Sequence, residues 1–155
     1  MQVAYDFASK QSTDPSTQNG AVLITKHNNR ICGANHFALG VKESEERWTR
    51  PLKYNFVEHA ERNVIYAAAR QGLATDGATM YCPWFACADC ARAIIQAGIV
   101  EVVGHDTPIH ATHPNWRDSI KLALEMFDES GVKYRHITGD MGGIPIRFNG
   151  SIVHV

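Results

Sequence analysis

Residues 79–103 read TMYCPWFACADCARAIIQAGIVEVV, and this stretch decides the fold class. Thr79 to Pro83 predicts a short strand, Cys87 to Ala97 a helix, and Ile99 to Val103 a second apolar strand. Gly98 marks the end of the helix, because glycine adopts the left-handed backbone that follows many helices. Strands that alternate with helices favour a layered α/β domain.

The same alternation continues on both sides of this stretch. The other predicted elements are a helix over 3–10, a hairpin of strands over 20–25 and 30–34, a helix over 58–71, a helix over 115–130 and a strand over 133–137. The polar run from Asn35 to Asn55 predicts a long surface excursion. The tail from Gly139 is rich in glycine and ends in the apolar residues 152–155, which we expect at a sheet edge or a subunit contact.

Composition bounds the class of protein. The chain has 155 residues, 45% of them hydrophobic and 20% charged, which predicts a single ordered domain over 1–155. Its 15 basic and 16 acidic residues give a net charge of −1, which argues against a polynucleotide partner but leaves a small nucleotide ligand open. The sequence has no apolar run long enough for a bilayer and no secretory signal, so we expect a cytoplasmic protein without membrane contact.

Two short motifs stand at the starts of two predicted helices: His59-Ala60-Glu61 and Cys87-Ala88-Asp89-Cys90. The spacing of the cysteines puts both sulfurs on one side of a helical turn, where the positive helix end favours thiolates. One imidazole and two thiolates suit zinc, and three protein ligands leave the fourth tetrahedral position open, as catalytic sites require. Taken alone, the cysteines also fit a redox pair, or a closed structural zinc site with Cys82 as the fourth ligand.

His-x-Glu followed by Cys-x-x-Cys resembles the signature of the zinc-dependent cytidine and deoxycytidylate deaminases. The likeness extends through Ser12 to Ile24, Gly33-Ala34-Asn35, Lys53 to Ile65, Met80-Tyr81 and Ala91 to Ile99. It implies a cytidine-deaminase-like three-layer α/β/α sandwich with a central mixed sheet. It also implies Zn²⁺ held by His59, Cys87 and Cys90, Glu61 as the proton shuttle, Asn35 on the sugar hydroxyl, and the Ala60 backbone on the pyrimidine carbonyl.

The resemblance implies hydrolytic deamination of deoxycytidylate (dCMP) to dUMP plus ammonia, which supplies thymidylate synthesis, in a homo-oligomer that is a hexamer or dimer-based. Two alternatives stay open. One is a deaminase of another nucleoside, nucleotide or base, such as cytidine, dCTP, guanine or adenosine in tRNA. The other is a non-catalytic, zinc-stabilised binding module, in which Glu61 would have no use.

Four further sets of residues carry secondary predictions. Ala86 replaces the proline that the family usually has before its first cysteine; proline there is pre-organised for a helix start, so we expect a looser loop. Trp84 is the aromatic candidate for stacking on a base. The cationic candidates for a nucleotide phosphate are Arg47, Arg50, Lys53, Arg62 and Arg92. His105, His110 and His113 lie in a turn-rich stretch that favours an exposed loop over a second metal site.

Overall fold

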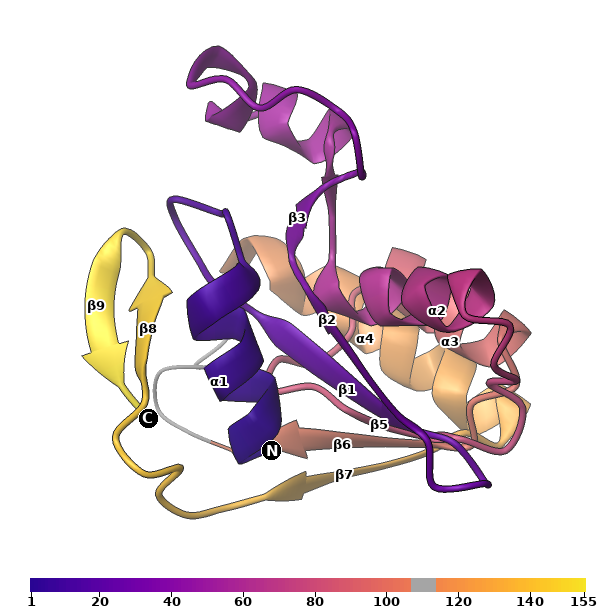
Figure 1. Cartoon of the computed structure of the whole chain (residues 1–155). Helices are drawn as coiled ribbons and strands as arrows, with labels where there is room; N and C mark the ends of the chain where they lie inside the picture. The colour runs from indigo at the N-terminus through magenta and orange to yellow at the C-terminus, as the bar shows by residue number, and fades with distance from the viewer. Residues whose placement is uncertain (107–113) are drawn as a thin grey trace.

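A five-stranded mixed sheet forms the centre of the molecule (Figure 1). The computed structural model describes residues 1–106 and 114–155, and its central strands lie in the order β2-β1-β5-β6-β7. They are β1 (Gly20–Ile24), β2 (Arg30–Ala34), β5 (Thr79–Tyr81), β6 (Glu101–His105) and β7 (Lys133–Ile137). β1 pairs antiparallel with β2 and β5, whereas β5, β6 and β7 run parallel because a helix separates each from the next. This confirms the predicted α/β class and mixed sheet.

Helices cover both faces of the sheet. α1 (Gln2–Gln11) packs on one face, and α2 (Ala60–Arg70), α3 (Ala88–Gln96) and α4 (Pro114–Ser130) pack on the other (Figure 1). Two glycines permit close approach: a Cβ at Gly20 would lie 2.2 Å from the Ala4 carbonyl oxygen of α1, and one at Gly33 would lie 2.6 Å from the Val64 nitrogen of α2. The three-layer sandwich that the resemblance implied is confirmed.

The predicted surface excursion is an arm, residues 38–56, that projects from the body beyond β3 (His36–Phe37) and β4 (Val57–Glu58) (Figure 1). Its short 3₁₀ helices are η1 (Glu46–Trp48) and η2 (Leu52–Asn55). The prediction holds for Leu39, which is 67% exposed, but it is wrong for Lys53, which is buried. Lys53 turns inward because its partner is a buried carboxylate of another segment.

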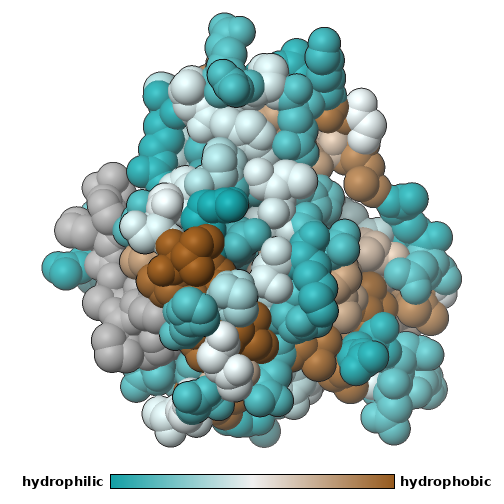
Figure 2. Space-filling view, turned by 60° about the vertical axis from the view of Figure 1, so that its left-hand side comes forward, coloured by the Kyte–Doolittle hydropathy of each residue, from teal (hydrophilic) through white to brown (hydrophobic). Residues whose placement is uncertain are grey.

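The C-terminal tail forms a hairpin of β8 (Pro145–Phe148) and β9 (Ser151–His154) that does not extend the central sheet. Residues 151–154 thus form an edge strand, but of this separate two-stranded sheet, and the alternative of a subunit contact stays a prediction. The hairpin lies beside α1, and Ile146 and Val155 pack with Tyr5 in a second apolar cluster. Figure 2, turned so that the side carrying this hairpin comes forward, shows hydrophobic side chains among hydrophilic ones on this face. Ile152 of β9 is exposed.

The main core lies between the sheet and the three-helix layer and includes Leu23, Met80, Ile94 and Phe127. Within residues 1–106 and 114–155, no helix combines the length and the apolar character that a bilayer crossing requires. His110 and His113 lie outside the described residues. His105 is buried, with Nδ1 2.7 Å from the Tyr5 hydroxyl and Nε2 2.9 Å from the Gly139 carbonyl oxygen.

Candidate active site

Two helix starts face one another in the three-helix layer. His59 is the N-cap of α2 and Cys87 is the N-cap of α3, both with extended backbone, and neither side chain caps its own helix. An N-cap side chain ordinarily accepts a hydrogen bond from its helix, so these two are available for other contacts. The N–H of Ala88 donates instead to the Ser119 hydroxyl of α4, at 3.0 Å.

The structure brings the three predicted zinc donors together. His59 Nδ1 lies 3.6 Å from Cys87 Sγ and 3.5 Å from Cys90 Sγ, and all three donor atoms lie within 4.8 Å of one another. Tetrahedral zinc bonds of roughly 2.0–2.3 Å place a nitrogen and a sulfur about 3.6 Å apart. The donor set and its spacing therefore fit a zinc ion. Among the described residues, Cys82 is no part of this group, and all four cysteines are free thiols.

The two cysteines of this group do not hold protons equally. A hydrogen bond from Cys90 lowers the pKa of Cys87 to about 4, although burial opposes the change. The same bond and burial raise the pKa of Cys90, so one thiolate and one thiol share a proton. Burial alone would lower the pKa of His59, but its hydrogen bond to Cys87 and the charge of Glu61 raise it overall. A metal ion that binds here must displace protons.

Glu61 lies in the first turn of α2 and is 3% exposed. Burial raises the pKa of its carboxyl group, and the nearby His59 partly offsets that rise. Its Oε2 is buried and has no hydrogen-bond partner among the described residues. Buried polar atoms are nearly always paired, so an unpaired carboxylate oxygen beside a metal-type donor set indicates a reactive group.

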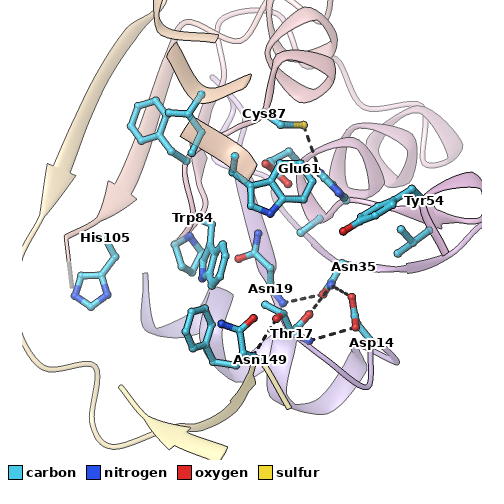
Figure 3. A pocket seen from close by; sticks show the side chains of 18 of the residues that line it. Asp14, Thr17, Asn19, Asn35, Tyr54, Glu61, Trp84, Cys87, His105 and Asn149 are labelled. Carbon is cyan, nitrogen blue, oxygen red and sulfur yellow. Dashed lines mark hydrogen bonds between the residues drawn. The ribbon is translucent and has the colours of Figure 1, made fainter. Parts of the chain in front are cut away.

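A cavity of about 750 Å³ opens beside these residues. Figure 3 shows Cys87 and Glu61 at one end and Asp14, Thr17, Asn35 and Asn149 at the other. We call these the zinc end and the polar end. Aromatic side chains also line the cavity. They include Tyr54 and Trp116, whose rings meet edge to face at 6.2 Å, and Trp84 and Phe148, whose rings lie 5.1 Å apart.

A buried ion pair organises the polar end. Lys53 Nζ lies 2.8 Å from Asp14 Oδ2, and their side chains are 7% and 4% exposed. Asp14 Oδ1 accepts the backbone N–H groups of Ser16 and Thr17, at 2.8 and 3.2 Å. The local pattern Asp-Pro-Ser predicts a turn, and this turn is present. Sequence reasoning missed Asp14 as a pocket residue, because its partner Lys53 is distant in the chain.

Asn35 lines the same cavity, and its amide is occupied within the protein. Its oxygen accepts hydrogen bonds from the Ser12 hydroxyl at 2.6 Å and from the Asn19 N–H at 2.7 Å. Its nitrogen donates to Asp14 Oδ2 at 3.1 Å and to the Thr17 carbonyl at 2.7 Å. A contact between Asn35 and a sugar hydroxyl stays a prediction. Because Asn35 is hydrogen-bonded to Asp14, such a hydroxyl would contact both side chains together.

Of the five cationic candidates, only Arg50 and Lys53 are among the described residues that line the cavity. Lys53 is neutralised by Asp14. Arg47 donates to the Lys42 carbonyl within the arm, and Arg92 pairs with Asp89 on the exposed surface of α3. Within residues 1–106 and 114–155, Arg50 forms no ion pair; its Nη2 lies 3.4 Å from the Ser16 hydroxyl.

Arg62, the remaining candidate, contacts one of the three zinc donors and is not among the described residues that line the cavity. It pairs with Glu58 one turn earlier in the chain, and its Nη1 donates to Cys90 Sγ at 3.8 Å. Burial would lower its pKa, but the bond to Glu58 and the charge of Cys90 raise it. The interpretation of Arg62 as a phosphate contact is therefore wrong, and a cation beside a sulfur favours the thiolate form that a metal needs.

Ala86 lies two residues before the first helical residue of α3, and it is fully buried. The pre-organising effect of proline belongs to the first helical position, which is Ala88 here. The expected loosening of the loop at Ala86 therefore has no basis in the helix start. The methyl side chain of Ala86 instead packs in the main core.

Comparison with known proteins identifies a matching family and two similar proteins. The family model for the cytidine and deoxycytidylate deaminase zinc-binding region matches residues 1–105. An uncharacterized deaminase encoded in the luxG 3′ region of Aliivibrio fischeri is 37% identical over 79% of this chain and 80% of its own length. Deoxycytidylate deaminase of Homo sapiens is 31% identical over 96% of this chain and 83% of its own length.

The fold also has solved relatives. The dCMP deaminase from the cyanophage S-TIM5, crystallised with dCMP and dUMP, superposes with a TM-score of 0.67 at 24% identity. The superposition covers 88% of this chain and 92% of that one. At this level of identity the likeness establishes the common fold.

Proposed function

The chain belongs to the cytidine and deoxycytidylate deaminase family, and on that premise we propose that it hydrolyses dCMP to dUMP and ammonia. It is a hydrolytic deaminase with zinc as its cofactor. One observation carries the proposal: a buried carboxylate oxygen without a partner stands beside a His-Cys-Cys donor set. A purely structural zinc site would have no use for that carboxylate.

The reaction replaces a C–N bond of the pyrimidine with a C–O bond from water. Zinc held by His59, Cys87 and Cys90 would act as a Lewis acid that lowers the pKa of a water molecule to about 7. Glu61 takes one proton from the attacking water and delivers it to the ring nitrogen. It then takes the remaining proton of that water from the hydroxyl group added to the ring carbon and carries it to the departing amine, which leaves as ammonia. Burial raises the pKa of Glu61, so its carboxyl group holds each proton between transfers.

Other residues would position the substrate. The Ala60 N–H lies at the start of α2, where free backbone donors favour a carbonyl oxygen, and we assign it the pyrimidine carbonyl. Asn35 together with Asp14 takes the sugar hydroxyl. The rings of Tyr54, Trp116 and Trp84 form aromatic walls suited to a planar base.

Arg50 is our candidate for the 5′-phosphate. Its guanidinium lines the cavity and is not neutralised by a described carboxylate, whereas Lys53 is held by Asp14. One uncompensated arginine at the polar end suits one phosphate group. This arrangement favours a nucleoside monophosphate over a free nucleoside, and the net charge of −1 disfavours a tRNA substrate.

The test is a substrate panel on purified protein with zinc quantified on the same sample. Released ammonia should be fastest with dCMP, and slower with deoxycytidine, cytidine, dCTP, guanine and a tRNA anticodon stem. Rapid turnover of cytidine with none of dCMP would overturn the substrate assignment. Fully zinc-loaded protein that releases ammonia from no candidate would favour the non-catalytic binding module.

We also propose that residues 1–155 act as one domain, in a homo-oligomer, in the cytoplasm. The arm exposes the apolar side chains of Leu39 and Val41, which supports a contact between copies. The two thiols of the donor set suit a reducing compartment, where disulfides do not compete with the metal. Sedimentation velocity of wild type and of Leu39→Ser tests the assembly, and a monomeric wild type would contradict it.

A further inference from the structure

The hairpin β8–β9 contributes part of the cavity wall, although it lies beyond the residues that the family model matches. Phe148, at the end of β8, and Asn149, at the tip, both line the cavity. Figure 3 places Asn149 beside Thr17, at the polar end. The chain therefore completes its pocket with residues that the zinc-binding region does not include.

The hairpin tip is fixed to the N-terminal loop, residues 12–19, so its position in the wall is well defined. The bonds are Gln18 N–H to the Arg147 carbonyl (2.8 Å), Arg147 N–H to Gln18 Oε1 (2.8 Å), Gly150 N–H to the Ser16 carbonyl (2.8 Å) and Asn149 N–H to the Thr17 hydroxyl (3.2 Å). The same loop carries Asp14 and touches Arg50 through the Ser16 hydroxyl. Arg50 and Asn149 therefore contact neighbouring residues of one loop, Ser16 and Thr17.

Asn149 has a left-handed backbone, with φ of 48°, and the following Gly150 has φ of 82°. Asparagine and glycine are usual at the tip of a two-residue hairpin, so the turn alone would accept either residue at position 149. The backbone N–H of Asn149 serves the turn. Its side-chain amide forms no hydrogen bond with residues 1–106 and 114–155, and it therefore has donor capacity for a ligand in the cavity.

We propose that Asn149 is a specificity residue, whose side-chain amide donates to a phosphoryl oxygen of the nucleotide at the polar end. This rests on the proposed function, because the base at the zinc end directs the phosphate to the opposite end of the cavity. The nearby carboxylate of Asp14 is neutralised by Lys53, so it does not repel an anion there. The hairpin thereby makes the chain discriminate a nucleotide from its nucleoside.

The test compares Asn149→Asp and Asn149→Gly, two changes that the left-handed turn tolerates. The glycine variant removes the donor and should raise the KM for dCMP about tenfold. The aspartate variant adds a repelling charge and should raise it about a hundredfold. In both variants kcat, and the KM for deoxycytidine, should change less than about twofold.

Asn28→Asp is the matched control. Asn28 is the other left-handed asparagine, with φ of 61°, in the exposed turn between β1 and β2, and this change should alter neither KM. The affinity for dUMP, measured by calorimetry, gives a readout that does not need turnover. If wild type deaminates dCMP but Asn149→Asp binds dUMP as wild type does, the inference is wrong and the proposed function stands.

If wild type binds dUMP and Asn149→Asp does not, yet no substrate is deaminated, the proposed function fails and phosphate recognition by Asn149 stands. Equal losses for dCMP and deoxycytidine would overturn the inference, because they would assign Asn149 a structural role only. Circular dichroism and zinc content establish that each variant is folded. The glycine variant keeps the proposal testable if the aspartate variant is unstable.

Discussion

The zinc end and the polar end of the pocket are built in opposite ways. The zinc end takes its donors and its carboxylate from two short motifs, each at the start of one helix. The polar end combines four segments: the N-terminal loop, Asn35 between β2 and β3, Lys53 of the arm and the C-terminal hairpin. The residues that carry the reaction chemistry therefore lie close together in the sequence, whereas recognition of the rest of the substrate depends on tertiary contacts between distant segments.

The largest expected effect is at the zinc end. Cys90→Ala removes one of three donors, so the protein should lose zinc at micromolar free metal and lose all measurable activity. Cys32→Ala is the control, because Cys32 is a half-buried free thiol on β2 outside the donor group. Retained stoichiometric zinc in Cys90→Ala, measured by atomic absorption, would break the assignment of the zinc end.

Glu61→Gln should lower kcat about 10³-fold with zinc content unchanged, because the amide cannot carry protons. Steady-state kinetics on dCMP and metal analysis of the same preparation measure both quantities. Full activity in this variant would contradict the role of Glu61 as the proton shuttle.

At the polar end the expected effect is on stability. Lys53→Met leaves the buried Asp14 carboxylate without its cation, which should cost about 3 kcal/mol of unfolding free energy. Lys26→Met is the matched control, because the Lys26–Asp76 pair is exposed and should change stability by less than about 0.5 kcal/mol. Urea unfolding measures both, and equal effects would show that the buried pair does not organise the polar end.

Adding Asp14→Asn to Lys53→Met sharpens that result. The amide removes the stranded charge while keeping an oxygen for the Ser16 and Thr17 N–H groups. The double variant should therefore recover part of the lost stability. A further loss would mean that the charge of Asp14 is not the source of the cost.

A smaller effect is the pH dependence of Glu61 in chelator-treated protein. Burial raises its folded pKa above the ordinary value of 4.5, so the folded state keeps a proton that the unfolded chain releases. Stability from this group is present below pH 4.5 and is lost as pH rises through the raised pKa. Relative to wild type, Glu61→Gln should gain stability with pH, by at most about 1.4 kcal/mol per pH unit, in urea titrations from pH 4.5 to 8. A constant difference would contradict a raised pKa.

The smallest expected effect is that of Arg92→Ala. It breaks an exposed ion pair with Asp89 away from the cavity, so kcat/KM should stay the same and stability should change by less than about 0.5 kcal/mol. A raised KM for dCMP would indicate that Arg92 contacts the phosphate, and it would contradict the assignment of phosphate binding to the polar end.

The sequence predicts the helices well because their signals are local. α2 and α3 begin and end within one or two residues of the predicted bounds, each followed by a glycine of positive φ. β6 begins two residues later than predicted, at Glu101, although Ile99 is apolar and buried. The Ile99 N–H bonds to the Ile94 carbonyl and completes the end of α3, so this residue belongs to the helix cap.

The polar end could not be predicted in the same way. A run of charges such as that in the arm is usually solvated, and nothing near Lys53 in the sequence indicates its pairing with Asp14. Asn149 and Gly150 carry an ordinary turn signal, and only the folded chain places them against the N-terminal loop. Asn35 was found through the family resemblance, and its turn-like context gave no sign of its four internal hydrogen bonds.

The bonds between the hairpin tip and the N-terminal loop also bear on the order in which the pocket is completed during synthesis. The last zinc donor, Cys90, leaves the ribosome well before Asn149, which must fold back onto a loop made near the start of the chain. The metal donors can therefore assemble on a nascent chain whose substrate pocket still lacks one wall.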